Sequence, residues 1–171
     1  MIFAGIDLAA REKNITGVAI IEDIRIGVYS VHRDDEIIGK IVEHEPSIVA
    51  IDAPMSLENR RVDIYLRKYG ALSLKIPAMQ NLAKRGMRIK RILEKKYKVI
   101  EVFPTATAKI LGFYDKDKKN MLSYFKNRWS VEDVRNEHEV DAIIAAYTAL
   151  LYAKGECVEM DGVVFPKEEN L

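Results

Sequence analysis

The sequence predicts one α/β domain, residues 1–171, in which a mixed five-stranded sheet carries helices on both faces. Three β-rich runs follow one another in the first 31 residues, and later apolar runs alternate with helical patterns. Strands joined by short links form an antiparallel meander, whereas strands that alternate with helices lie parallel. The length of 171 residues, 49% of them hydrophobic, is enough to bury the core of a single domain of ordinary size.

The first half of the chain supplies four of the expected strands and one helix. The meander covers 2–8, 15–22 and 25–31. The apolar run at 47–52 is typical of a strand that helices cover on both faces. Between them, 34–43 gathers its isoleucines on one face and begins with acidic residues, which suits the positive end of a helix dipole.

The second half is expected to alternate helices with one further strand. The helices are expected at 57–69, 78–96, 104–112 and 136–154, and the strand at 98–102. The charged segment 114–130 shows no clear period and is expected to be a solvated turn anchored by Leu122, Tyr124, Phe125 and Trp129. Asp161-Gly162 lies between two short apolar runs and is a hairpin signal.

A carboxylate stands at the end of each of two strands and inside the last helix. Asp7 follows the first apolar run and Asp52 the fourth, while Asp141 interrupts an otherwise apolar helix. A buried charge costs several kcal/mol unless it is paired or coordinates a cation. The three acids therefore predict a shared metal site. Glu101 ends the fifth strand and either joins this site or bonds the neighbouring loop.

The order of the elements, a meander followed by a helix and then alternating strands and helices, is that of the ribonuclease H fold. In that fold the first, fourth and fifth strands are parallel neighbours. Asp7, Asp52 and Glu101 are therefore expected to open at one edge of the sheet, where ligands bind outside the carboxyl ends of parallel strands.

Several short motifs, in their order and spacing, resemble the DUF429 family of predicted nucleases with a ribonuclease H-like fold. They are GIDLA at 5–9, VAIDAP at 49–54, RVDIYLR at 61–67, RG at 85–86, VIEVFPTA at 99–106 and HEVDAIIAAYTA at 138–149. The resemblance implies a metal-dependent nuclease-like site at Asp7, Asp52 and Asp141. His138 with Asp141 also resembles the corresponding helix of Holliday-junction resolvases. The helix-borne glutamate of ribonuclease H has no clear match, which weighs against cleavage of RNA:DNA hybrids.

Phosphodiester hydrolysis explains why carboxylates are suited to such a site. Two divalent ions can activate a water and neutralise the charge that develops on the phosphate, and Mg2+ or Mn2+ takes hard carboxylate oxygens. We expect Asp7 to bridge the ions and Asp52 and Asp141 to hold one each. His138, one turn before Asp141, either orients a water or phosphate or is a structural histidine with satisfied hydrogen bonds.

Basic side chains predict the contacts with substrate. Arg61 and Arg85 are expected to reach a nucleic acid if their helix ends approach the site, and Arg88 belongs to a basic stripe on the long helix. The stripe comprises Lys84, Arg88, Arg91 and Lys95. It is either a track for the phosphate backbone, whose contacts would be salt-sensitive, or a solvated helix face.

These features together predict a metal-dependent nuclease that cleaves DNA or RNA. The alternatives are a phosphate- or nucleotide-binding protein of the same fold that cleaves no polymer, and a non-catalytic interaction module. The net charge of +1 excludes a strong global field. The chain has no apolar run of the ~18 residues that span a membrane, so a cytoplasmic protein without a membrane partner is expected. A homodimer is one open alternative, and the scarcity of glutamine hints at a thermophile.

Overall fold

The computed structural model describes residues 1–169 and contains eight strands in one sheet within that range. The strands are β1 (Ile2–Asp7), β2 (Thr16–Glu22), β3 (Arg25–Val31), β4 (Ile48–Asp52), β5 (Lys98–Val102), β6 (Ser130–Val131), β7 (Cys157–Met160) and β8 (Val163–Pro166). The α-helices are α1 (Asp34–His44), α2 (Arg61–Tyr65), α3 (Pro77–Leu93), α4 (Pro104–Ile110), α5 (Leu122–Lys126) and α6 (Glu137–Ala153). Two short 3-10 helices are η1 (Leu66–Tyr69) and η2 (Lys118–Met121).

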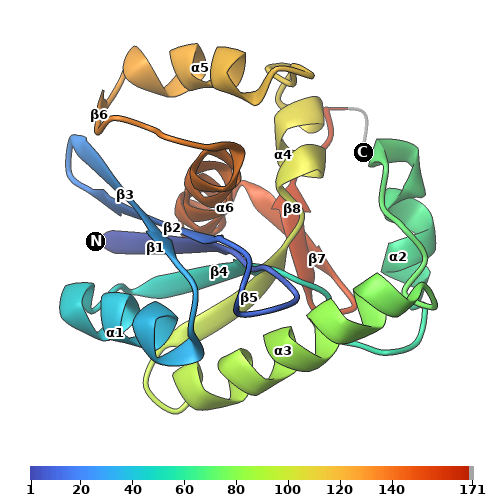
Figure 1. Cartoon of the computed structure of the whole chain (residues 1–171). Helices are drawn as coiled ribbons and strands as arrows, with labels where there is room; N and C mark the ends of the chain where they lie inside the picture. The colour runs from blue at the N-terminus through green and yellow to red at the C-terminus, as the bar shows by residue number, and fades with distance from the viewer. Residues whose placement is uncertain (170–171) are drawn as a thin grey trace.

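The sheet has the order β6-β3-β2-β1-β4-β5-β8-β7, so the five predicted strands form its centre (Figure 1). β1, β2 and β3 are antiparallel neighbours, while β4 and β5 run parallel to β1. The predicted count of five strands is wrong. β6 pairs with β3, and the hairpin signalled by Asp161-Gly162 lays β8 and β7 against the outer side of β5. This pairing covers a strand edge that would otherwise be open to association.

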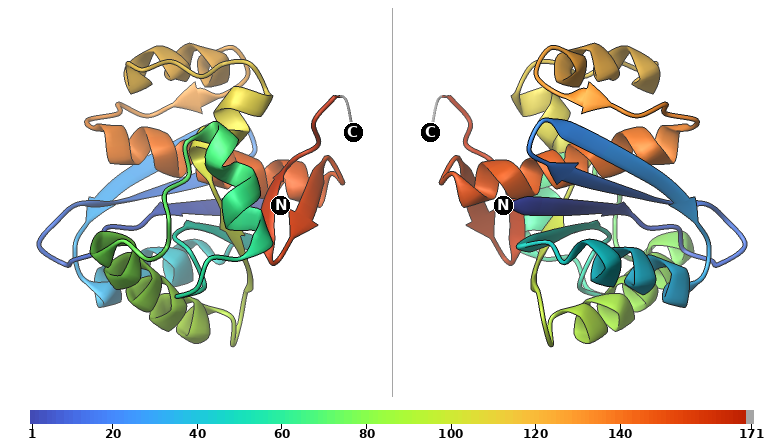
Figure 2. Two further views of the ribbon diagram at one scale, coloured as in Figure 1. Left: turned by 90° about the vertical axis from the view of Figure 1, so that its right-hand side faces the viewer. Right: turned by 90° about the vertical axis from the view of Figure 1, so that its left-hand side faces the viewer.

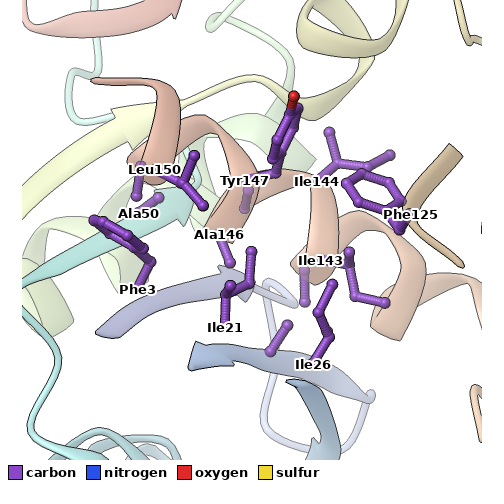
Figure 3. Close-up of a cluster of buried hydrophobic side chains, with 14 of the residues drawn as sticks. Phe3, Ile21, Ile26, Ala50, Phe125, Ile143, Ile144, Ala146, Tyr147 and Leu150 are labelled. Atoms are coloured by element: carbon purple, nitrogen blue, oxygen red, sulfur yellow. The ribbon is translucent and has the colours of Figure 1, made fainter. Parts of the chain in front are cut away.

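Helices cover the two faces of the sheet, as predicted. α6 lies on one face, with α4 and α5 outside it, and α1 and α3 lie on the other (Figures 1 and 2). Alternate side chains of a strand point to opposite faces, so the sheet contributes to two cores. The α6 face buries Phe3, Ile21 and Phe125 among others (Figure 3). The opposite face buries Ile6, Ile51 and the inward residues of α1 and α3.

Two glycines bring α6 unusually close to the sheet. A methyl group on Gly5 would lie 2.1 Å from the carbonyl oxygen of Ala142 and 2.3 Å from the backbone nitrogen of Ala146. A methyl group on Gly17 would lie 2.2 Å from the carbonyl oxygen of His138. Neither position has room for a side chain, because the helix backbone fills the space. This contact sets the height of α6 above β1 and β2.

Several predicted boundaries shift. α2 is shorter than the expected 57–69 helix and continues as η1, and α3 ends at Leu93. The segment 114–130 contains η2 and α5, and its expected anchors Leu122, Phe125 and Trp129 are buried against α6. Asn136 caps α6 as predicted, because its side chain accepts a hydrogen bond of 3.0 Å from the Glu139 N–H. Within residues 1–169 no helix is both long and apolar enough to cross a membrane.

Candidate functional site

Asp7 and Asp52 lie side by side at the carboxyl edge of the sheet. They close β1 and β4, which are parallel, and the pairing register sets Asp7 directly opposite Asp52. Paired residues of neighbouring strands point to the same face, and Asp7 shares the parity of Phe3, which packs against α6. Both carboxyl groups therefore point to the α6 face. The structure confirms that these acids share one edge.

Asp141 reaches the same place from above, on the second turn of α6. Its side chain is only 12% exposed. His138 lies one turn earlier, and its Nδ1 is 3.0 Å from Oδ2 of Asp7. The close approach of α6 at Gly17 is the reason that His138 can reach Asp7. Three elements far apart in the sequence thus deliver Asp7, Asp52 and Asp141 to one location.

The acids repel one another and are partly shielded from water. Burial raises the pKa of Asp52 well above its ordinary value, and repulsion from Asp7 and Asp141 adds to the rise. Burial and repulsion from Asp7 likewise raise the pKa of Asp141, to about 6. The hydrogen bond to Asp7 raises the pKa of His138. Excess negative charge at this site is therefore incompletely neutralised by the chain itself.

Lys118 is a neighbour of the acids that was not predicted from the sequence. It lies on η2 and forms an ion pair with Oδ2 of Asp141. Burial lowers the pKa of Lys118, but the hydrogen bond to Asp141 outweighs this and raises it. The charged turn 115–120 gave no period that could have shown which of its lysines turns inward. Only the buried aromatic anchors that follow it hinted that the segment lies over α6.

The donor set suits a hard divalent cation, although its present arrangement is not closed around one. Among residues 1–169, no three side chains of aspartate, glutamate, histidine or cysteine are arranged so that they could hold a metal ion as they stand. The Lys118 ammonium occupies one oxygen of Asp141 and so takes the place of a cation there. Carboxylate oxygens are nevertheless the ligands that Mg2+ or Mn2+ prefers. A cation bound among these acids would relieve the repulsion that helps to raise the pKa values of Asp52 and Asp141.

Glu101 does not join the three acids, which corrects its expected place. It pairs with Ile51 in register and so points to the opposite face of the sheet from Asp52. There it accepts hydrogen bonds of 2.8 and 2.7 Å from Arg60 and one of 3.1 Å from the Met55 N–H. Strand alternation is the physical reason: Glu101 is the residue before the last one of β5, so its side chain points to the face opposite that of Asp52, the last residue of β4.

Arg60 links Glu101 to Asp63 in a buried ion-pair network. Its guanidinium bonds the Asp63 carboxylate at 2.8 and 3.0 Å, and the Asp63 side chain in turn accepts the Arg60 N–H at 2.7 Å. Burial opposes the charge of Arg60, but the bonds to Glu101 and Asp63 hold its pKa above the ordinary value. Burial raises the pKa of Glu101, and the bonds from Arg60 and the Met55 N–H counter that rise.

The arginines expected to bind substrate lie in different environments. Arg85 is only 3% exposed and donates to Asp34 at 2.9 Å, to the Ala9 carbonyl at 2.7 Å and to the His32 carbonyl at 2.7 Å, so it is a structural residue instead. Arg88 is half exposed and bonds the other oxygen of Asp34 at 2.9 Å. Arg61 is exposed at the first residue of α2, and its substrate contact stays a prediction.

Comparisons with known proteins bear on the fold. No family model matches the chain, and no curated protein matches it either, so the resemblance to DUF429 stays a prediction. Among solved structures, RuvC of Thermus thermophilus in complex with a Holliday junction substrate superposes with a TM-score of 0.56 at 16% identity. A second Thermus thermophilus RuvC structure gives a TM-score of 0.54 at 16% identity. Each match covers 98% of this chain and 100% of the other.

The chain therefore has the α/β fold of RuvC, which is ribonuclease H-like. At 16% identity this similarity shows the fold alone. The ribonuclease H-like fold agrees with the sheet order β3-β2-β1-β4-β5 at the centre of the molecule.

Proposed function

We propose that this protein is a divalent-metal-dependent nuclease that hydrolyses nucleic-acid phosphodiester bonds. The observation that supports the proposal is the meeting of Asp7, Asp52 and Asp141 at the carboxyl edge of a ribonuclease H-like sheet. Buried acids that repel one another are costly to keep, and a cation removes that cost. RuvC, which shares the fold, was solved with a Holliday junction substrate, and this favours nucleic acid as the substrate class.

Each residue of the site has a role in this proposal. Asp7, Asp52 and Asp141 hold Mg2+ or Mn2+, which when bound makes water more acidic and neutralises charge on a phosphate. His138 is 48% exposed and tied to Asp7, so it is placed to contact the phosphate from the solvent side. Lys118 supplies a positive charge beside Asp141. A protein that binds a metal nucleotide without cutting a polymer would use the same acids.

A cleavage assay separates these alternatives. Labelled single-stranded, duplex and branched DNA and RNA are incubated with the protein and Mg2+, Mn2+ or a chelator. We expect metal-dependent cleavage of at least one polymer, and a loss on the order of a hundredfold or more for Asp52→Asn, since even outer-shell partners of metal ligands are worth 10- to 100-fold.

The matched control is Asp23→Asn at the opposite edge of the sheet. Asp23 has a φ of 53°, a conformation that asparagine also adopts, and this variant should cleave as the wild type does. Metal-dependent stabilisation without cleavage of any of these polymers would contradict the nuclease and favour nucleotide binding.

A further inference from the structure

An open groove continues from the acid site along the β1–β2 loop. Its volume is about 620 Å3. The floor is formed by Ala9, Ala10 and Ile15 of the loop, and the rim carries Lys13, with His32 and His138 from the ends of neighbouring elements. We call it the β1–β2 groove.

His138 connects the groove to the acids. Its side chain lines the groove, and its Nδ1 is 3.0 Å from the Asp7 carboxylate. The floor begins at Ala9, two residues after Asp7. A polymer with one phosphate at the acids would therefore have its neighbouring units at this groove.

The lining of the groove matches a sugar–phosphate chain. Lys13 and the two histidines are its only ionisable lining groups within residues 1–169, and no carboxylate lines it. The alanines leave the floor shallow and apolar, which suits a sugar, while the basic rim suits phosphates. The rim carries no tyrosine, phenylalanine or tryptophan on which a base could stack. Contacts here would follow the backbone and not the base sequence.

A second groove differs in charge. It has a volume of about 700 Å3 and lies between α3, β5 and the turn that joins β7 to β8. Four carboxylates, from Glu94, Glu101, Glu159 and Asp161, line it together with the cations of Arg60, Lys90 and Lys98. Arg60 and Lys90 are paired with Glu101 and Glu94, so this groove has no excess positive charge to offer a phosphate. The β1–β2 groove, by contrast, has no carboxylate among its lining residues.

The walls of the β1–β2 groove are fixed by buried hydrogen bonds. The Arg85 guanidinium donates to the carbonyl oxygens of Ala9 and His32, each at 2.7 Å, and to Asp34 at 2.9 Å. The Ala9 N–H donates to the Thr16 hydroxyl at 3.0 Å. Loop β1–β2 and the end of β3 are thus held in place before any ligand binds. Preorganisation of this kind lowers the ordering cost of binding.

We propose that the β1–β2 groove binds the sugar–phosphate backbone of the nucleic-acid strand on one side of the scissile phosphate, with Lys13 as its main phosphate contact. This assignment rests on the proposed nuclease function for the identity of the polymer. Arg85, which was expected to touch substrate, shapes the groove from below and touches none.

The test is the salt dependence of binding. A fluorescein-labelled oligonucleotide of mixed sequence is titrated by anisotropy in chelator with wild type, Lys13→Ala and Lys13→Arg. We expect Lys13→Ala to weaken binding and to lower the slope of log K against log salt by about 0.7 for a single strand or about 0.9 for a duplex. Lys13→Arg keeps the charge and should keep the slope.

Two further variants control for position and fold. Lys154→Ala removes an exposed lysine at the end of α6 away from His138 and should leave the slope unchanged. Ala10→Glu places a carboxylate on the groove floor and should weaken binding at least as much as Lys13→Ala, whereas Ala10→Gln has similar size and should weaken it less. In a cleavage assay Lys13→Ala should raise KM and leave kcat unchanged.

The outcomes separate this inference from the nuclease itself. If wild type binds, Lys13→Ala weakens it and no polymer is cut, the nuclease proposal fails and the groove stands. If wild type cuts and Lys13→Ala changes neither KM nor the salt slope, the groove is overturned while the nuclease stands. Equal losses for Lys13→Ala and Lys154→Ala, or no binding by wild type, also overturn the groove.

Discussion

Two groups of buried carboxylates occupy opposite faces of the same sheet edge, and the chain neutralises their charge to different degrees. On the face away from α6, Arg60 holds Glu101 and Asp63 with four hydrogen bonds between 2.7 and 3.0 Å. On the α6 face Asp52 lies against Asp7 and Asp141, and Lys118 pairs with Asp141. The planar guanidinium of Arg60 donates two hydrogen bonds to each carboxylate and so neutralises the first group. The other keeps unbalanced negative charge.

The difference shows how structural acids can be told from candidate functional acids in this molecule. The Arg60 network is closed, since both carboxylates meet the same guanidinium and need no ligand. The α6-face acids have raised pKa values because they repel one another where water is scarce. Perturbed acids in a cluster are candidates for function. Substitutions that break one group at a time test this distinction.

The largest effect is expected from Arg60→Met, which leaves Glu101 and Asp63 buried without their partner. Removing one member of a buried ion pair costs about 3 to 5 kcal/mol, because Glu101 is only 8% exposed. Denaturant unfolding should show this loss, and the added change Glu101→Gln should recover part of it. Below the melting temperature kcat should match that of wild type. A fall in kcat with unchanged stability would place Arg60 in the site.

Gly5→Ala should disturb the α6 face specifically. The new methyl group meets the backbone of Ala142 and Ala146 at 2.1 and 2.3 Å, so α6 must move away and carry Asp141 with it. Overpacking of this kind costs about 1 to 3 kcal/mol, and cleavage should fall as well. Gly39→Ala is the matched control, because nothing lies within 4 Å of its new methyl group. It should be neutral or stabilise α1 by up to about 1 kcal/mol. Equal effects of the two changes would contradict the close-packing role of Gly5.

Asp141→Asn should change how stability responds to pH. A carboxyl whose pKa rises on folding, here to about 6 from 3.8, binds a proton more tightly in the folded state. The metal-free protein therefore loses stability as the pH rises from about 3.8 to about 6, because the carboxyl group of Asp141 becomes charged in this range. In chelator, wild type should lose on the order of 1 to 2 kcal/mol relative to Asp141→Asn between pH 4 and 7. Urea unfolding at several pH values measures this difference, and a greater loss for the variant would mark Asp141 as a structural acid.

The smallest effect is expected from Arg88→Ala. Arg88 is 51% exposed and shares Asp34 with the buried Arg85, so its ion pair should contribute less than about 1 kcal/mol. Burial raises the pKa of Asp34, but the bonds from Arg85 and Arg88 outweigh it and lower the pKa. That stability is present at neutral pH and is lost as the pH falls through the lowered value. Thermal melts at neutral and acidic pH should show a small loss that vanishes in acid.

Much of the fold follows from local patterns in the sequence. The alternating apolar runs predict all five central strands, and Asn136 with Glu139 marks the start of α6. The placement of Asp7 and Asp52 at one edge follows from the end points of two parallel strands. The hairpin at Asp161-Gly162 was also visible, but which strand it would pair with depends on the open side of β5 and not on local residues.

The rest of the site depends on contacts that have no local signature. Glu101 is level with Ile51 and not with Asp52, and a pairing register uncertain by one residue cannot be read from the sequence. Lys118 and Lys119 look alike in the sequence, and only the path of η2 turns Lys118 to Asp141. Arg85 and Arg88 lie on one helix, and burial against Ala9 and His32 makes the first structural.

The most direct test of the central claim is a crystal structure soaked with Mn2+, with anomalous scattering to locate the metal. We expect a peak held by Asp7, Asp52 and Asp141, with Lys118 moved away from the oxygen of Asp141 that it now occupies. Glu101 should stay bound to Arg60. A metal peak at Glu101, or no peak at the three acids while Lys118 keeps its place on Asp141, would contradict the shared metal site.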